Sequence, residues 1–159
     1  MSYIDKDVSG VPRVAALYQP SGCSAANWYP NFSGFRSLSV PAILTIVLTK
    51  PSDVLVSYSF FLDGSDAATA VGNIVTFGRI LLNGGAQTNS VWVAEQTATA
   101  GGGGSLQATA ASVAHSFVIP NLAAGTHTLE LQVQVSWPNY TPAAGGEAEY
   151  DNIVASWVA

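Results

Sequence analysis

Strict alternation of apolar and polar residues is the feature that most limits how this chain can fold. In the segment 126–137, every second residue from position 129 is apolar: Leu129, Leu131, Val133, Val135 and Trp137. Neighbouring side chains of an extended strand point to opposite faces, so these residues would form one dry face. No segment keeps the 3.6-residue period of an amphipathic helix over ten residues. The pattern predicts half-buried antiparallel strands.

Eight segments have this strand character and are separated by residues that favour turns. They are residues 11–18, 38–49, 53–62, 73–83, 90–97, 112–119, 126–137 and 149–159. The breaks contain the sequences KPSD, DGSD, NGG, PNLAAG and PNYTPAAGG, which are typical of turns and loops. Eight strands without a helix predict an all-β sandwich or barrel.

Charged residues are few, and this limits the partners that the chain can bind. Its 159 residues include five Lys or Arg and ten Asp or Glu, which is 9% against about 25% in typical proteins. The formal net charge is -5, and no Lys or Arg follows Arg79, so we expect no nucleic-acid partner. A surface with so little charge is expected to be covered by copies of the chain or by a larger assembly.

Nothing in the sequence predicts insertion into a membrane or secretion. The first ten residues, MSYIDKDVSG, contain two acids and no apolar run, so we expect no signal peptide. The longest apolar run, residues 40–48, is too short for a membrane span and contains Pro41. The length suits one domain that needs no disulfide, and we expect Cys23 to be a small, partly buried hydrophobe.

Several of the expected strands are apolar on both faces. Segments 38–49, 53–62 and 149–159 each place apolar residues opposite their main apolar row. Such strands are covered either by another layer or by another subunit, and without helices a subunit is the better covering. We therefore predict a subunit interface that contains Ile43, Val47, Leu55, Phe61, Ile153 and Trp157.

The chain offers little for catalysis, and we expect neither an enzyme nor a cofactor. Its two histidines, His115 and His127, each continue an apolar row beside a loop, so we interpret both as structural residues that bond a loop carbonyl. They flank the PNLAAG loop, which leaves open that they lie on neighbouring strands. A metal site would normally need three or four ligands. No H-E-x-x-H, G-x-S-x-G, Walker or C-x-x-C motif is present.

Two groups of carboxylates leave a calcium site open as a weaker alternative. Asp63 and Asp66 lie in a DGSD turn, where aspartate usually bonds its own backbone. Glu147, Glu149 and Asp151 are spaced by two and would line one face of a strand, as a solvated acidic edge does. Because calcium takes 6–8 oxygen ligands, either group would supply only part of a site.

Three segments together resemble the C1q/TNF-type jelly roll. They are residues 39–64, two long strands joined by a Pro-Ser-Asp turn, GRILLNGG at 78–85, and HSFVIPNLAAGTHTLELQVQV at 115–135. Similar patterns occur in bacteriophage fibre, head-fibre and capsid-decoration proteins. The resemblance spans about residues 38–159 and implies an antiparallel jelly-roll sandwich of about eight strands, a threefold homotrimer and a binding or structural role. It implies no catalytic residues.

The resemblance leaves residues 1–37 as an N-terminal arm that packs on, or extends from, a jelly-roll domain formed by residues 38–159. Our candidates for docking on a partner are Tyr3, Ile4, Tyr18, Trp28, Tyr29 and Phe32. We therefore predict a non-enzymatic virion structural protein, a trimeric capsid-decoration protein that binds and stabilises the capsid surface. It would be made in the host cytoplasm and bind the major capsid protein or another virion protein. The alternative is a carbohydrate- or receptor-binding module whose loop aromatics stack on a glycan.

Overall fold

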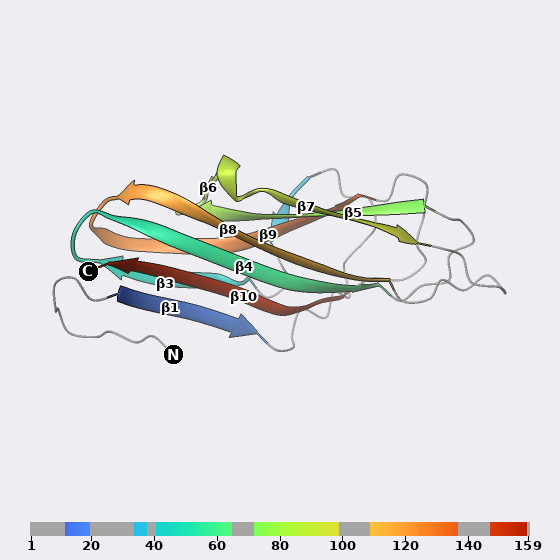
Figure 1. Cartoon of the computed structure of the whole chain (residues 1–159), viewed down its shortest axis with the longest axis horizontal. Helices are drawn as coiled ribbons and strands as arrows, with labels where there is room; N and C mark the ends of the chain where they lie inside the picture. Colours follow the sequence, from blue (N-terminus) through green and yellow to red (C-terminus); the bar gives the residue numbers. More distant parts are fainter. Residues whose placement is uncertain are drawn as a thin grey trace.

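The computed structural model describes residues 12–19, 34–37, 41–64, 72–98, 109–136 and 147–158. Almost all of these residues are in strands (Figure 1), and within the described ranges the helical structure is the three-residue 3-10 turn η1 (Thr88–Ser90). The all-β prediction is confirmed. This part of the chain has no helix with the length and apolar character that crossing a bilayer requires.

All eight segments with strand periodicity are strands. The long strands are β1 (Pro12–Gln19), β3 (Ile43–Leu48), β4 (Ser52–Gly64), β5 (Gly72–Leu82), β7 (Trp92–Ala98), β8 (Thr109–Leu122), β9 (Gly125–Ser136) and β10 (Glu147–Val158). The two short strands β2 (Arg36–Ser37) and β6 (Gly85–Ala86) were not predicted. β3 starts at Ile43, shortly after Pro41, which has no N–H to donate to a sheet. Residues 38–40 of the expected strand lie outside the described residues.

The long strands pair as a rolled-up hairpin. β1 pairs with β10, β3 with β9, β4 with β8 and β5 with β7, always antiparallel. Pairing of β10 with β4 and of β9 with β5 then produces two sheets. Sheet A has the order β1-β10-β4-β8, and sheet B has β3-β9-β5-β7, with β2 paired to β9 and β6 to β5. This topology is a jelly-roll sandwich, so the predicted fold class is confirmed.

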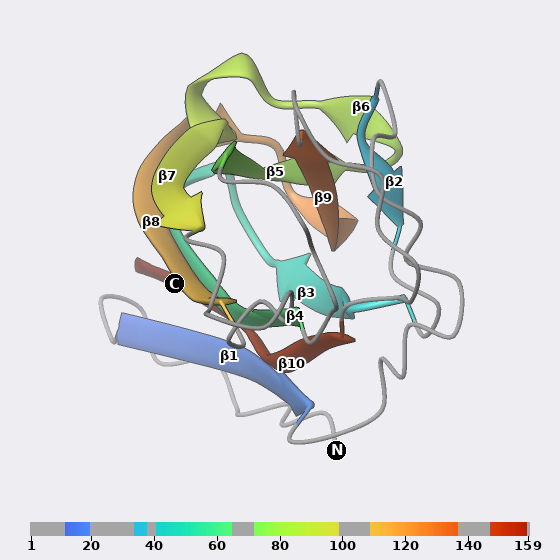
Figure 2. The same ribbon diagram turned by 90° about the vertical axis from the view of Figure 1, so that its right-hand side faces the viewer.

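The two sheets face each other across an apolar core. Seen along the strands (Figure 2), β7 of sheet B and β8 of sheet A lie side by side at one margin. At the other margin, the edge strand β1 of sheet A contacts the edge strand β3 of sheet B. Residues that are completely buried in this core include Val54, Val56, Ile80, Leu129, Leu131 and Val133. The three β9 residues are the start of the alternating row found in the sequence, and the prediction that this row is dry is confirmed for them.

Ile153 is a core residue, so its prediction as a subunit-interface residue is wrong. Its exposed fraction in the chain alone is 0%. Both faces of β10 are apolar, and Ile153 and Ala155 occupy the inner face while Val154 and Val158 occupy the outer one. Trp157 continues the inner row and is half-buried against the core. Alternation separates the two faces of a strand but does not tell which of them points inward.

β1 belongs to the N-terminal arm and is an edge strand of sheet A, paired with β10 along its whole length. At residues 12–19 the arm therefore packs on the domain, which is one of the two arrangements expected. The domain boundary near residue 38 stays a prediction. The remaining arm residues singled out in the sequence lie outside the described residues: Tyr3, Ile4, Cys23, Trp28, Tyr29 and Phe32.

Candidate interaction surface

His127 is a structural residue whose ring is held from both sides. Its Nε2 lies 2.9 Å from the carbonyl oxygen of Ala123, and its Nδ1 lies 3.0 Å from Nδ2 of Asn83. Asn83 Oδ1 accepts the N–H of Thr128 at 2.9 Å, which directs the Asn83 Nδ2 toward the ring. Because a carbonyl only accepts, the imidazole donates from Nε2 and accepts at Nδ1. The predicted bond to a loop carbonyl is confirmed.

His115 also bonds a backbone carbonyl, that of Asn89, at 3.2 Å from Nε2. Its ring stacks between Trp92 and Phe117, with centroid distances of 5.0 and 6.1 Å and interplanar angles of 11°. The structural interpretation of His115 is therefore confirmed. The idea that His115 and His127 lie on neighbouring strands is wrong, because β8 belongs to sheet A and β9 to sheet B.

The carboxylate groups do not form a recognisable metal site among the described side chains. In that part of the chain, no three His, Cys, Asp or Glu side chains could hold one ion. The backbone pairs Glu147 with Asp63, and a bulge between Glu149 and Asn152 interrupts the alternation on which the acidic row depends. The calcium alternative stays a prediction, because the described side chains do not include those of Asp63, Asp66, Glu147, Glu149 and Asp151.

The outer face of sheet B is covered by a polar network. Nε and Nη2 of Arg79 donate to Oε1 of Gln132 at 3.0 and 2.7 Å, and the guanidinium lies 4.1 Å from the ring centroid of Phe35. Gln132 also donates to the hydroxyl of Ser37 at 3.2 Å, and Ser37 bonds Glu130. The side chain of Ser37 therefore connects strand β2 to the centre of this face.

The predicted interface residues are divided between the two outer faces of the sandwich. Ile43 and Val47 are exposed on the outer face of sheet B, on strand β3. Leu55 is exposed on the outer face of sheet A, on strand β4. The side chain of Phe61 is outside the described set. Each contact in a cyclic trimer joins two different surfaces, so the role of these residues in one interface stays a prediction.

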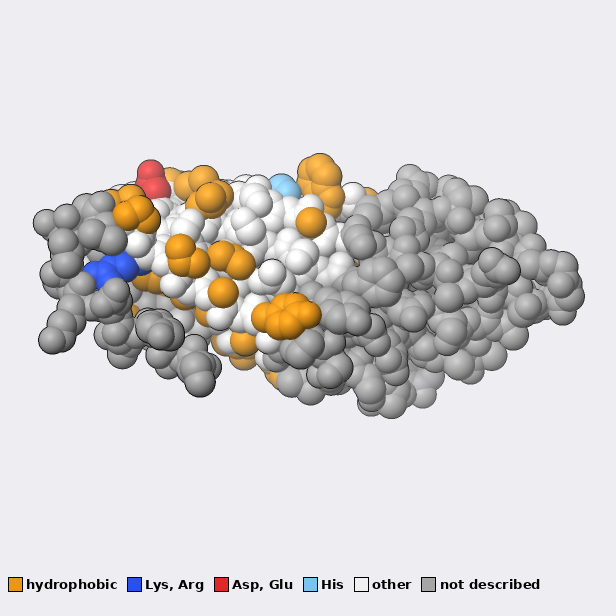
Figure 3. Space-filling view, turned by 60° about the horizontal axis from the view of Figure 1, so that its bottom comes forward, with side chains coloured by type: hydrophobic (Ala, Val, Ile, Leu, Met, Phe, Trp, Pro, Cys, Tyr) orange, Lys and Arg blue, Asp and Glu red, His pale blue; other side chains and the backbone are white. Residues whose placement is uncertain are grey.

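The outer face of sheet A carries three adjacent rows of residues without a charged side chain. From β1 to β8, the rows are Val14, Ser156, Leu55 and Val118; Ala16, Val154, Ser57 and Ser116; and Tyr18, Asn152, Ser59 and Ala114. We call these residues the uncharged face. In the view that brings β1 and β10 forward (Figure 3), hydrophobic side chains lie among uncharged polar groups, and the charged side chains lie at one end.

Apolar side chains on this face are unusually open to solvent. The exposed fractions are 62% for Val14, 59% for Tyr18, 47% for Leu55 and 45% for Val118. Between them, the hydroxyls of Ser57 and Ser116 bond each other at 2.8 Å. Tyr18 and Leu55 were predicted as contact residues from the sequence, whereas Val14 and Val118 were not, because strand register is needed to align them.

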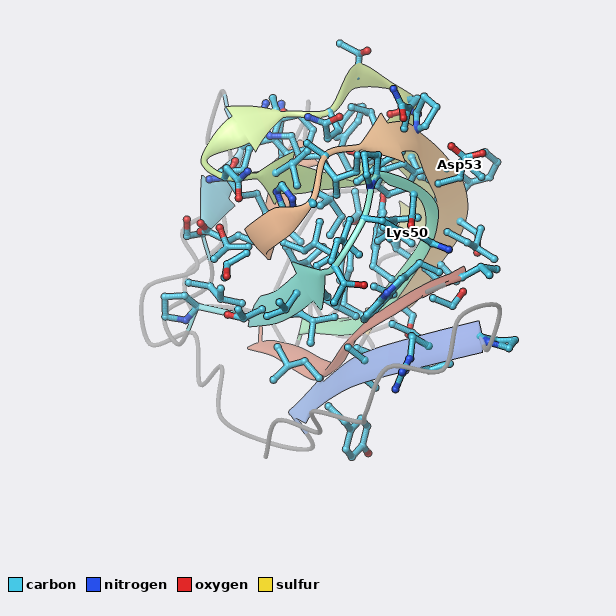
Figure 4. All side chains as sticks on the ribbon, turned by 90° about the vertical axis from the view of Figure 1, so that its left-hand side faces the viewer. Lys50 and Asp53 are labelled. Atoms are coloured by element: carbon cyan, nitrogen blue, oxygen red, sulfur yellow. The ribbon has the colours of Figure 1, made fainter. Side chains whose placement is uncertain are left out.

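Charge is found at the end of the sandwich where β3 turns into β4. Figure 4 shows Lys50 and Asp53 at this end, on either side of the turn. Oδ1 of Asp53 accepts the N–H of Asn121 at 2.7 Å, and this bond supports the positive φ of 48° at Asn121. The turn therefore bounds the uncharged face with polar groups rather than extending it.

Trp92 forms the exposed end of an aromatic stack at the margin between β7 and β8. Its indole is 47% exposed and lies on the ring of His115, which in turn lies on the buried ring of Phe117. Tyr58 meets His115 edge-on, with a centroid distance of 5.9 Å. Stacking from below fixes the orientation of the indole, and a fixed, exposed indole can contact a sugar or a protein.

Comparison with known proteins assigns no family. No family model matches the sequence, and no curated protein matches it. Similar solved structures include infectious bursal disease virus, Gx strain, with a TM-score of 0.47 and 13% identity over 99% of this chain and 36% of that chain. The present chain therefore spans about a third of the length of that viral chain.

Two further similarities concern bacterial and metagenomic proteins. Dimeric latent PorU from Porphyromonas gingivalis has a TM-score of 0.45 and 13% identity over 94% of this chain and 13% of that chain. The CBM36-1 domain of a multidomain xylanase from the hindgut metagenome of Trinervitermes trinervoides has a TM-score of 0.28 and 10% identity over 90% of this chain and 96% of that chain. At these scores and identities, none of the similarities assigns a function.

Proposed function

We propose that this chain is a non-enzymatic structural protein of a virion, a trimeric capsid-decoration protein that binds and stabilises a capsid surface. The observation that carries the proposal is the uncharged face, where valine, leucine and tyrosine side chains are exposed to solvent on the outer face of sheet A. Covering apolar surface with protein removes it from water, and at about 25 cal/mol per Å² this favours assembly. Its partners would be its own copies and a capsid protein.

The charge balance supports assembly over binding to polyanions. With five basic and ten acidic residues, the chain has no basic surface that could neutralise a phosphate backbone. Both histidines are held in structural hydrogen bonds, which fits a role without acid–base catalysis. The resemblance of residues 39–64, 78–85 and 115–135 to C1q/TNF-type domains supports a threefold assembly.

The proposal is tested by the mass of the native protein and by its location in a lysate. We expect native mass spectrometry and light scattering to give a trimer over a wide range of concentration. We also expect the chain to sediment with particles and to remain on them after a high-salt wash, because apolar contacts are not screened by salt. A monomer found only in the soluble fraction would contradict the proposal.

A carbohydrate-binding module is the second candidate, and the exposed Trp92 indole is the observation that favours it. If this alternative is correct, a glycan array will show binding that Trp92→Ala abolishes. The matched control is Tyr18→Ala, which removes an exposed aromatic ring from the outer face of sheet A. Equal binding by wild type and Trp92→Ala, or no binding by either, would reject this candidate.

A further inference from the structure

We propose that the uncharged face is the surface through which one copy of this chain binds another. This inference rests on the structural function proposed above and names the part of the molecule that self-association uses. It commits to a second copy of the chain as the occupant of the face. Three observations carry it: the distribution of charge, the chemistry of the serine hydroxyls and the size of the face.

The distribution of charge favours a second copy. The chain has a net charge of -5, so two copies that meet through acidic surfaces repel each other. None of the ten acidic and five basic residues is part of the uncharged face. Contact between two copies through this face therefore places no like charges opposite each other.

The polar groups of the face suit contact with another copy in the head-to-tail arrangement of a cyclic trimer. They include four serines, Ser57, Ser59, Ser116 and Ser156. A hydroxyl both donates and accepts, so it can bond either kind of polar group on another copy, whereas an ammonium only donates and a carboxylate only accepts. Ser57 and Ser116 already bond each other at 2.8 Å, which lowers the cost of removing water from the centre of the face.

The size of the face fits the centre of a stable contact. Strands lie about 4.8 Å apart and same-face residues about 6.8 Å apart, so four strands and three rows cover roughly 400 Å² in plan. A standard interface buries about 800 Å² on each partner and has an apolar centre with a polar rim. The contact must then extend beyond the face to a rim, which at one end contains Pro12, Val158 and the polar turn with Lys50 and Asp53.

The outer face of sheet B lacks these properties. Arg79 and Glu130 place charge on it, and side-chain hydrogen bonds to Gln132 and Ser37 satisfy its polar groups within one copy. Its exposed apolar residues Ile43, Val47 and Val93 lie on two strands at opposite edges of the sheet instead of filling a row across it. A charge inserted on the outer face of sheet B therefore serves as the control for a charge inserted on the uncharged face.

The test compares two charge insertions at matched positions. Leu55→Lys places an ammonium on the uncharged face, and Val47→Lys places one at a similarly exposed strand position on the outer face of sheet B. We expect wild type and Val47→Lys to be trimers in native mass spectrometry. We expect Leu55→Lys to dissociate, with a dissociation constant raised about a hundredfold or more, because an unpaired charge would be buried in the contact.

Circular dichroism of each variant shows whether the fold is kept. If Leu55→Lys fails to fold, Val118→Lys, an exposed position in the same row, replaces it with the same expected outcome. A wild-type monomer would overturn both this inference and the proposed function. A wild-type trimer that Val47→Lys dissociates, or that none of the variants dissociates, would overturn this inference and leave the proposed function standing.

Discussion

Tyr58 occupies the space that a side chain at Gly78 would need. A Cβ atom on Gly78 would lie 2.6 Å from Cε2 of Tyr58 and 2.9 Å from Cε1 of Phe60. Tyr58 is on β4 of sheet A and Gly78 is on β5 of sheet B, so the ring crosses the core from one sheet to the other. Its hydroxyl then donates to the carbonyl of Ser90 at 2.7 Å.

Gly78→Ala is expected to lower the free energy of unfolding by about 1–3 kcal/mol, because the added methyl group forces the Tyr58 and Phe60 rings apart. Urea denaturation followed by circular dichroism measures this. Gly34→Ala is the control, since a Cβ at Gly34 meets no atom within 4 Å. Equal stability of the two variants would show that the Tyr58 ring can move aside without cost.

Tyr58→Phe is expected to make the stability of the fold less dependent on alkaline pH. Burial raises the pKa of the Tyr58 phenol, and a hydrogen bond with the backbone of Trp92 lowers it by less. The unfolded phenol ionises near pH 10, at about its ordinary pKa, while the folded one stays neutral to higher pH. The contribution of Tyr58 to the free energy of unfolding is thus present below about pH 10 and is lost as the pH rises further.

Thermal unfolding at neutral and alkaline pH checks this prediction. At neutral pH, Tyr58→Phe should cost about 1–2 kcal/mol, since the Ser90 carbonyl loses its donor. Above pH 10 the difference from wild type should shrink. Tyr18→Phe, which changes an exposed ring, should follow the wild-type profile. Parallel curves for wild type and Tyr58→Phe would contradict the assignment.

Thr76→Val is expected to stabilise the protein by about 1 kcal/mol. The Thr76 side chain is fully buried, and its Oγ1 has no hydrogen-bond partner among the described residues. Valine has nearly the same shape and removes the cost of burying an unpaired hydroxyl. The melting temperature should rise, while Thr45→Val, at an exposed position of β3, should leave it almost unchanged. A lower melting temperature for Thr76→Val would refute the prediction.

Asn83 and His127 are expected to be energetically coupled. Asn83 has a φ of 50°, so Asn83→Gly keeps the backbone relaxed and removes only the side-chain bonds. In a double-mutant cycle with His127→Ala, the second substitution should cost less after the first, with a coupling energy of about 1 kcal/mol. Urea unfolding of the four proteins measures it, and strict additivity would mean that the bond contributes nothing.

Much of the fold is predictable because the geometry of a strand imposes a regular two-residue pattern on the sequence. Side chains alternate every two residues, so the dry row that begins at Leu129 and the exposed residues Val47 and Leu55 follow from the pattern alone. The turn at Asn83 and Gly84 is equally predictable, because both have positive φ and both residue types tolerate it.

The remaining features depend on contacts between distant segments. The short PNLAAG connection suggests a hairpin, but β8 and β9 belong to different sheets, and only the pairing with β4 and β5 decides this. The uncharged face is assembled from four strands in a register that local alternation does not specify. Val14 and Val118 belong to the same row although 104 positions separate them in the sequence (118 − 14).

β10 is the last strand to be synthesised, but it lies in the middle of sheet A and is the partner of the first strand, β1. β10 separates β1 from β4, so sheet A cannot be completed until residue 158 has left the ribosome. Until then, β1 has no partner in the sheet, and the apolar row of β4 lacks one neighbour. Domains usually fold from the N-terminus as they emerge, but here the first strand waits for the last. A nascent chain halted before β10 therefore presents open strand edges to any neighbouring chain.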